Sequence, residues 1–389
     1  MKTLVLFVRI IVGLLFIFSG LVKANDPLGL SYKMQEFFEL WGMIKFYPAT
    51  LSLSVLMNAF EIIAGVALLI GWRIRLFIWL LLLLIIFFTF LTGYAHFSGK
   101  FHNCGCFGDC IPISANMSFN KDVILLVLII FLFWQQKKIL PLFGKRTSVI
   151  TMIVVSILSF FLQWYTLTYL PLVDCLPFKK GNNIPVQMKS PPGSRPDSMA
   201  IVFVYKKGGK EFEFSPADLP ADLKTYKFVS RNDKLIRKGN AQPAISGFSL
   251  SGNTNIDSTQ IVLEHPFTIL LFCENFSTPL SSWEQEFGNI YKVAREKNIP
   301  VYLITIQPSK AAEIIRKTSF SDIPVFKCDE TPVRTAARTN PCIYILERGT
   351  VRDKWSYKHM NKALKELGSI PPQQKTESGI PGADTTITP

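Results

Sequence analysis

The stretch HNCGCFGDC, residues 102–110, places three of the seven cysteines of this 389-residue chain in one short loop. The first chemistry that this spacing suggests is thiol–disulfide exchange between Cys104 and Cys106. Two residues of extended chain span about 7 Å, too far for a disulfide, so Gly105 must turn the chain for the bridge to form. Such a small ring is strained, and strained disulfides are the more oxidising ones. The spacing therefore predicts a redox-active pair, with Cys110 or Cys175 as the resolving or relaying thiol.

Two other interpretations of this loop remain open. His102 together with the three thiols offers four metal ligands, although CxC followed by CxxxC is not the usual zinc spacing. Alternatively, a structural disulfide holds the loop over the neighbouring helices and leaves the remaining thiol free or paired with Cys175. The redox state of the loop in intact membranes distinguishes thiols that cycle from a permanent bridge.

Two ionisable residues, Arg9 and Glu61, lie inside otherwise apolar segments. Charged side chains are costly within a bilayer and are therefore functional candidates. We expect them either to pair with each other across two helices or to bind a quinone or another polar ligand. A quinone would be the cofactor of a membrane thiol oxidase.

The apolar segments themselves predict a multi-pass all-α membrane bundle. A helix that crosses a bilayer needs about 20 mostly apolar residues. The windows that qualify are residues 4–22, 51–71, 76–94, 123–140 and 149–170. The first window could instead be a cleaved signal peptide. However, VKA at its end is a poor cleavage site and Arg9 lies inside it, so we expect a retained span.

Basic residues predict the orientation of these spans. Short cytoplasmic connections are rich in Lys and Arg, and two connections fit: one holds Arg73 and Arg75, the other four basic residues between 137 and 146. The opposite loops also hold lysines, Lys23 among them, but they are longer and carry acids. The cysteine loop and everything after residue 170 would then face the outside of a bacterial cytoplasmic membrane, in the periplasm, where thiols tend to be oxidised.

Composition separates the chain into two parts and excludes one function class. The chain is 49% hydrophobic and 18% charged, with the apolar excess confined to the first part. Its net charge of +14 comes from scattered lysines without an arginine-rich helix or interleaved aromatic residues, so we expect no nucleic-acid partner.

The sequence predicts two membrane segments followed by an extracytoplasmic part. Residues 1–145 are predicted as the membrane domain and residues 146–172 as the fifth span. Residues 173–243 are predicted as a linker and a small α+β subdomain, because MAIVFVYKKGGKEFEF has the alternation of a hairpin. In residues 244–370, buried strands alternate with helices, which predicts a partly parallel sheet. Residues 371–389 are predicted to be disordered.

The order of elements in residues 244–370 resembles thioredoxin. Asn340-Pro341, which enters the final hairpin, stands where that family keeps its cis-proline. The positions of the thioredoxin CxxC motif read Ser277-Thr278-Pro279-Leu280, so both redox cysteines are missing and the resemblance implies a degenerate thioredoxin-like domain. Three further thiols are interpreted as buried small side chains or, for the last two, as a disulfide between neighbouring strands: Cys273, Cys328 and Cys342.

The membrane domain has a resemblance of its own. FSGLVKANDP after the first span, NAFEIIAGVALLIGW with Glu61 and Gly65, and the CGCFG loop resemble the DoxX and MauE (methylamine utilisation protein) families over about the first 145 residues. The resemblance implies a four-helix core, here followed by a fifth span. MauE-type proteins are membrane partners in disulfide formation during methylamine dehydrogenase maturation, in which a separate thioredoxin-like protein is implicated. Methylamine itself is not implied as a substrate.

These expectations combine into two hypotheses. In the first, the protein performs thiol–disulfide redox chemistry or disulfide-dependent protein maturation, linked to quinone, with periplasmic protein thiols or partner redox proteins as substrates. Its candidate catalytic residues are Cys104, Cys106, Cys110 and Cys175. In the second, the chain is a non-enzymatic membrane anchor that presents a thioredoxin-like binding module. Loss of the CxxC thiols favours the second hypothesis.

Overall fold

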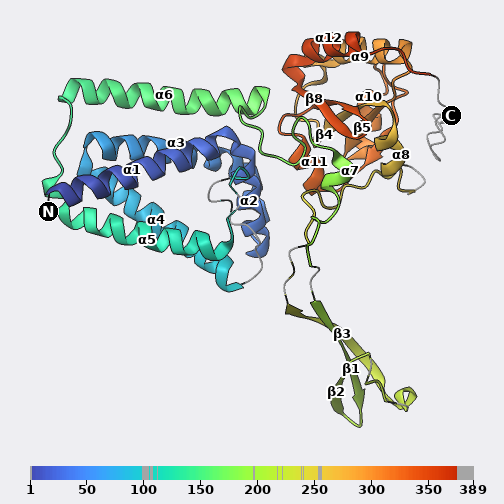
Figure 1. Cartoon of the computed structure of the whole chain (residues 1–389), viewed down its shortest axis with the longest axis horizontal. Coiled ribbons are helices and arrows are strands. Elements are labelled where there is room, and N and C mark those ends of the chain that lie inside the picture. Colours follow the sequence, from blue (N-terminus) through green and yellow to red (C-terminus); the bar gives the residue numbers. More distant parts are fainter. Residues whose placement is uncertain are drawn as a thin grey trace.

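The computed structural model describes residues 2–98, 105, 108–111, 113–195, 198–216, 218–220, 222–237, 239, 241–252 and 256–374. Of the predicted loop site, His102, Cys104 and Cys106 lie outside the described residues. The predicted disordered tail lies outside them from residue 375 onward. Within the described part, a bundle of long helices, an α/β domain and a separate small sheet can be distinguished (Figure 1).

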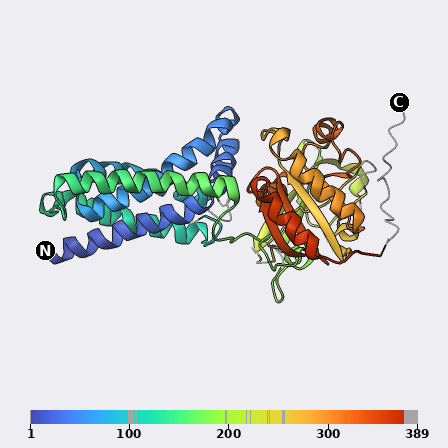
Figure 2. The same ribbon diagram turned by 90° about the horizontal axis from the view of Figure 1, so that it is seen from above.

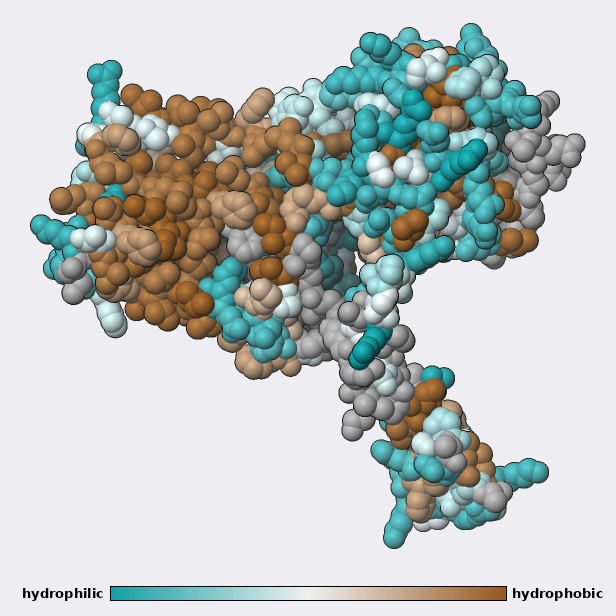
Figure 3. Space-filling view, viewed as in Figure 1, coloured by the Kyte–Doolittle hydropathy of each residue, from teal (hydrophilic) through white to brown (hydrophobic). Residues whose placement is uncertain are grey.

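Five helices in the described residues are long and apolar enough to cross a membrane, as predicted. Their apolar composition leaves many large hydrophobic side chains exposed, and Figure 3 shows this part as an almost continuous apolar surface. No other environment satisfies such a surface as well as lipid. The helices are α1 (Lys2–Asn25), α3 (Thr50–Ile70), α4 (Ile74–Ser98), α5 (Ala115–Gln135) and α6 (Lys145–Tyr169).

Glycines set the closest contact in the bundle, between the antiparallel helices α1 and α3. A Cβ atom on Gly65 would lie 2.8 Å from the backbone oxygen of Gly13, and one on Gly13 would lie 2.5 Å from the Leu69 side chain. Only residues without a Cβ permit this approach, which is typical of packed membrane helices. The short η1 (Ile44–Ala49) precedes α3, and η2 (Gln136–Lys138) follows α5.

A further helix, α2 (Pro27–Leu40), begins directly after the first span and was not predicted. Its start is fixed by Pro27 at the first helical position and by the Asp26 side chain, which accepts a hydrogen bond from the Gly29 backbone. In Figure 1 it lies across the end of the bundle nearest the α/β domain. It therefore supplies a surface on which the C-terminal part can dock.

The α/β domain contains a five-stranded sheet of order β6-β5-β4-β7-β8. Strands β4, β5 and β6 run parallel, whereas β7 and β8 are antiparallel additions. A mixed sheet preceded and followed by helices agrees with the predicted alternation of strands and helices. The strands are β4 (Phe267–Cys273), β5 (Val301–Thr305), β6 (Val325–Lys327), β7 (Cys342–Glu347) and β8 (Thr350–Ser356).

Side chains on both faces of this sheet are buried, because helices cover each side (Figure 2). One face packs on α9 (Glu284–Glu296), α10 (Pro308–Ile315) and α12 (Met360–Ser369), and the other on α8 (Thr259–Glu264) and α11 (Glu330–Ala336). Phe178 and Ile184, from the segment expected as an exit linker, are fully buried in this second core. Ile184 begins the short helix α7 (Ile184–Gln187).

The small sheet has the order β2-β1-β3, all antiparallel, and extends away from the α/β domain (Figure 1). The predicted hairpin is confirmed by the pairing of β1 with β2. The helical part of the predicted α+β subdomain is, in the described residues between β2 and β3, only a single 3-10 turn, η3 (Leu223–Thr225). The strands are β1 (Ser198–Lys207), β2 (Lys210–Phe214) and β3 (Lys227–Arg237).

Candidate functional site

Arg9 holds the end of a neighbouring helix. Its guanidinium donates to the backbone oxygens of Leu68 at 2.8 Å, Leu69 at 2.7 Å and Leu140 at 3.1 Å. The first two are carbonyls in the last turn of α3, where the helix carries partial negative charge, and the Leu68 carbonyl also accepts from the Gly71 amide at 3.3 Å. The predicted pairing of Arg9 with Glu61 is therefore wrong. The sequence alone does not show that Arg9 of α1 lies beside the last turn of α3.

Glu61 pairs instead with Lys23, and both side chains are nearly fully buried. Because α1 and α3 are antiparallel, Glu61 in the middle of α3 lies beside the last turn of α1, which contains Lys23. Along α1, Lys23 is about 21 Å from Arg9. The Lys23 ammonium also lies 4.9 Å from the centre of the Phe88 ring. Sequence reasoning missed Lys23 because it counted this residue as a loop lysine.

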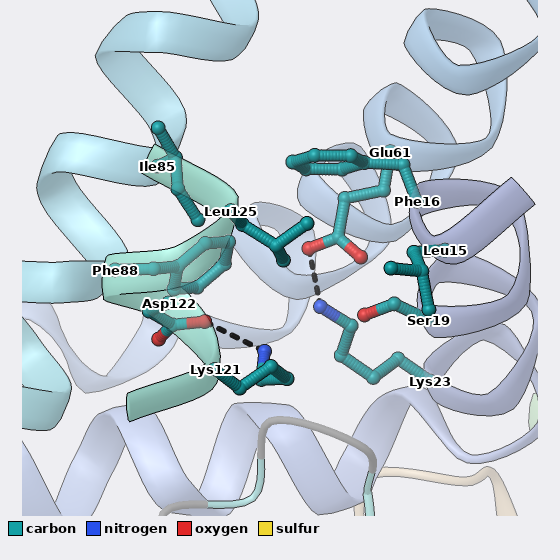
Figure 4. A pocket seen from close by; sticks show the side chains of 10 residues that line it. All are labelled: Leu15, Phe16, Ser19, Lys23, Glu61, Ile85, Phe88, Lys121, Asp122 and Leu125. Atoms are coloured by element: carbon teal, nitrogen blue, oxygen red, sulfur yellow. Dashed lines mark hydrogen bonds and ion pairs between the residues drawn. The ribbon is translucent and has the colours of Figure 1, made fainter. Parts of the chain in front are cut away.

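The Lys23–Glu61 pair lines a pocket between α1, α3, α4 and α5, here called the polar pocket (Figure 4). Across it lies a second ion pair, Lys121–Asp122, with 2.6 Å between Nζ and Oδ1. Thr92 donates to the other Asp122 oxygen at 3.0 Å. The remaining Glu61 oxygen, Oε2, is buried and has no hydrogen-bond partner in the part of the chain that the structure describes.

A second and more apolar pocket adjoins the first and is here called the aromatic pocket. Lys23 and Phe88 line both pockets, so the two share a wall. Gly105, the residue between Cys104 and Cys106 in the sequence, also lines the aromatic pocket. The remaining lining residues are Leu30, Lys33, Met34, Phe37, Phe38, Trp41, Leu53, Met57, Phe87, Leu91 and Thr92.

Cys110 and Cys175 form a disulfide. It joins the loop between α4 and α5 to the segment that follows α6, so it links the connection of the third and fourth spans to the end of the fifth span. Asn25 reinforces this connection, because its side chain donates to the backbone oxygen of Val173 at 2.8 Å and accepts from the Val173 amide at 3.0 Å. The pairing is one of those left open by the sequence, while the roles of Cys104, Cys106 and His102 stay predictions.

Directly beside the disulfide, Arg338 connects the α/β domain to the membrane domain. Its guanidinium lies 2.8 Å from Asp26 and 2.7 Å from Asp109, and only 4% of the side chain is exposed. Burial raises the pKa of the Asp26 carboxyl, although the positive charge of Arg338 acts to lower it. Burial alone would lower the pKa of Arg338, but Asp26 and Asp109 reverse this and raise it.

A second set of contacts extends this interface along α2. Tyr32 donates to Glu274 at 2.9 Å, and Arg334 lies 2.9 Å from the other oxygen of the same carboxylate. Both Arg334 and Arg338 face the Tyr32 ring, at 4.8 and 5.4 Å from its centre. Glu274 follows β4 directly, so the membrane domain docks at the end of the central strands.

The three cysteines of the α/β domain are free and buried, as the interpretation of small core side chains predicts for Cys273. Burial raises the pKa of Cys273 and raises those of Cys328 and Cys342 to about 12. The proposed Cys328–Cys342 disulfide is wrong, because both thiols are free and because β5 and β4 lie between β6, which Cys328 follows, and β7, which begins at Cys342. Near Cys342, the Asn340–Pro341 bond is cis, and the Thr278 hydroxyl donates to the Asn340 carbonyl.

Comparison with known families gives two matches. Residues 199–238, which cover most of the small sheet, match a domain of unknown function (DUF8463). Residues 1–135 match the family described as methylamine utilisation protein MauE. No curated protein and no solved structure matches the chain. The match covers the first four of the five membrane-type helices in the described residues, so the membrane domain is similar to the MauE family.

Proposed function

We propose that this protein performs thiol–disulfide redox chemistry at the outer face of a bacterial cytoplasmic membrane. The observation that carries the proposal is the Cys110–Cys175 disulfide, placed in the loop that also contains Cys104 and Cys106. Disulfides persist in oxidising compartments, so this bridge supports an extracytoplasmic position for the loop and for the α/β domain. The basic turn with Arg73 and Arg75 supports the same orientation.

The proposed reaction transfers oxidation from the loop to a protein dithiol. A substrate thiolate attacks one sulfur of a Cys104–Cys106 disulfide, forms a mixed disulfide and releases the other loop sulfur as a thiolate. The second substrate thiolate then attacks the substrate sulfur of the mixed bond, which oxidises the substrate and leaves the loop as a dithiol. Cys110, which follows Cys106 by four residues and is bridged to Cys175, is the candidate to relay this exchange.

The α/β domain fits the role of a substrate-binding module. Its strand order, with a cis-proline before β7, supports a thioredoxin-like fold, and Ser277 and Leu280 stand where that fold carries its thiols. With its remaining cysteines buried, this domain binds a partner rather than oxidising it. A purified fragment of residues 173–374, which keeps the core residues Phe178 and Ile184, should not catalyse insulin reduction.

Alkylation of intact membranes tests the redox proposal. Cys104 and Cys106 should change from protected to alkylatable on mild reduction, and single Cys104→Ser and Cys106→Ser variants should trap mixed disulfides with periplasmic proteins. Cys328→Ser is the matched control, because that thiol is buried, and it should behave as the wild type. A fixed state of both thiols under all conditions, or a bound stoichiometric metal, would sink the proposal.

Reporter fusions test the orientation independently. A phosphatase fused after Ser190 should be active and one fused after Trp72 inactive, because phosphatase folds only outside the cytoplasm. The reverse pattern would remove the compartment on which the chemistry depends.

The second candidate function is a membrane anchor that presents the α/β domain. The specific observation in its favour is that Ser277 and Leu280 replace the CxxC thiols. In that case the Cys110–Cys175 bridge is permanent, and replacing Cys104 or Cys106 leaves partner binding unchanged.

A further inference from the structure

The polar and aromatic pockets, which adjoin each other at Lys23 and Phe88, have the features of a ligand site that opens to the bilayer. Glu61 is 1% exposed, and its Oε2 oxygen lines the pocket without a partner among the described residues. A buried carboxylate oxygen normally has a donor, since leaving it unpaired costs free energy. The unused acceptor therefore points to a donor that is supplied by a ligand.

The shape of the lining determines what kind of molecule can enter. Leu53 and Phe87 line the aromatic pocket and are also 42% and 47% exposed on the apolar outside of the bundle. A ligand can thus enter sideways from the lipid. Inside, the rings of Phe37, Trp41 and Phe88 favour a flat, apolar molecule that stacks on them.

The charges at the inner end determine its polar group. Lys23 offers an ammonium that can donate to a carbonyl oxygen, and Glu61 Oε2 can accept from a hydroxyl. An anionic head group, such as that of a fatty acid or a phospholipid, would be repelled by the same Glu61 carboxylate. A neutral ring whose oxygen can be either a carbonyl or a hydroxyl satisfies both residues.

We propose that these pockets bind a membrane quinone, with its ring against Trp41 and Phe88 and one ring oxygen beside the Lys23–Glu61 pair, within reach of the Lys23 ammonium and of Glu61 Oε2. This inference rests on the proposed redox function, which requires an electron acceptor. The reduced Cys104–Cys106 dithiol of the loop and the quinone react to give the loop disulfide and the quinol, so that two electrons and two protons pass from the thiols to the quinone. Lys23 donates a hydrogen bond to the quinone carbonyl, and Glu61 Oε2 accepts a hydrogen bond from the hydroxyl of the quinol.

Photolabelling of the full-length protein in phosphatidylcholine nanodiscs tests the site without using activity. An azido-benzoquinone with a decyl tail should label residues of α2, α3 and α4 that line the aromatic pocket. Decyl-ubiquinone should displace the label, whereas decanol, which has the tail without the ring, should not. Label that decyl-ubiquinone does not displace, or that is spread over the lipid-facing surface, would overturn the assignment.

Variants locate the polar end of the ligand. Exchanging both members of the buried pair, Lys23→Met with Glu61→Leu, removes two opposite charges together and so should preserve folding. It should weaken decyl-ubiquinone displacement at least about tenfold, as expected for the loss of charge-assisted hydrogen bonds. Unchanged affinity in this variant would contradict the proposal.

Trp41→Leu and Trp79→Leu form a matched pair for the ring. Trp41 lines the aromatic pocket, while Trp79 is 52% exposed on the same membrane domain. Only the first change should weaken binding. Quinone binding without thiol cycling would refute the proposed function and leave the site intact, whereas cycling without saturable binding would refute the site alone.

Discussion

The buried charged side chains of the membrane domain are stabilised in two different ways. The Arg9 guanidinium donates to backbone carbonyls at the end of α3 and has no carboxylate partner among the described residues. Lys23 and Glu61 neutralise each other but leave one carboxylate oxygen unused. An isolated charge in a bilayer is expensive, so such pairing is expected on structural grounds alone. The unused oxygen is what distinguishes this pair from a purely structural contact.

The thiols of the α/β domain should be inert at neutral pH. With a pKa of about 12, only about one Cys328 or Cys342 thiol in ten thousand is a thiolate at pH 8. We expect maleimide to leave Cys273, Cys328 and Cys342 unmodified in the folded protein and to label all three in urea, as mapped by mass spectrometry. Fast labelling of any of them in the native state would contradict their assignment as core residues.

At the scale of elements, the close contact of α1 and α3 sets the geometry of the candidate site, because it brings Lys23 level with Glu61. Gly65→Ala would place a methyl group 2.8 Å from a backbone oxygen, which forces the helices apart. Overpacking of this kind costs about 1–3 kcal/mol. We expect a lower thermal unfolding temperature of the detergent-solubilised protein.

Gly144→Ala is the control for this change. Nothing lies within 4 Å of a Cβ at Gly144, which precedes α6. Its unfolding temperature should equal that of the wild type. Equal temperatures for Gly65→Ala and the wild type would mean that α1 and α3 are not held at this contact.

The sequence predicted elements better than their mutual placement. Five spans and the hairpin follow from apolar length and from alternation, which are local properties. The helix α2 was missed because its apolar and polar residues are mixed without a clear stripe. The partners of Arg9 and Glu61 depend on which levels of two antiparallel helices coincide, and a single sequence does not contain that information. The docking role of Arg338 had no local signal at all.

At the scale of the whole molecule, covalent and ionic links hold the α/β domain against the end of the membrane bundle. The Cys110–Cys175 disulfide and the Arg338 contacts meet there, because Asp109 precedes Cys110 in the chain. A change in the redox state of this loop would therefore act at the domain interface. Under the proposed function, Arg338 of the substrate-binding domain thus contacts Asp109, which directly precedes Cys110 of the proposed redox loop.

Replacing Arg338 tests this interface. Arg338→Met leaves Asp26 buried without its cation, and breaking a buried pair in this way costs about 3–5 kcal/mol. We expect faster amide hydrogen exchange in α2 and α11. Arg295→Met is the control, since Arg295 is 65% exposed and its pair with Asp322 contributes little. Equal exchange in both variants would show that Arg338 does not hold the domains together.

The same variant should respond to pH. Burial raises the pKa of Asp26 in the docked state above its ordinary value, and loss of Arg338 removes a charge that opposes this rise. A raised carboxyl pKa means that the docked state binds a proton more tightly than the undocked state, so docking strengthens as the pH falls through the docked pKa towards the ordinary pKa of an Asp. Exchange in α2 of Arg338→Met, corrected for the intrinsic pH dependence of exchange, should therefore be slower at pH 5 than at pH 8. In the Arg338→Met,Asp26→Asn double variant this difference should disappear, because the amide does not titrate. A pH effect that persists in the double variant would assign the titration to another group.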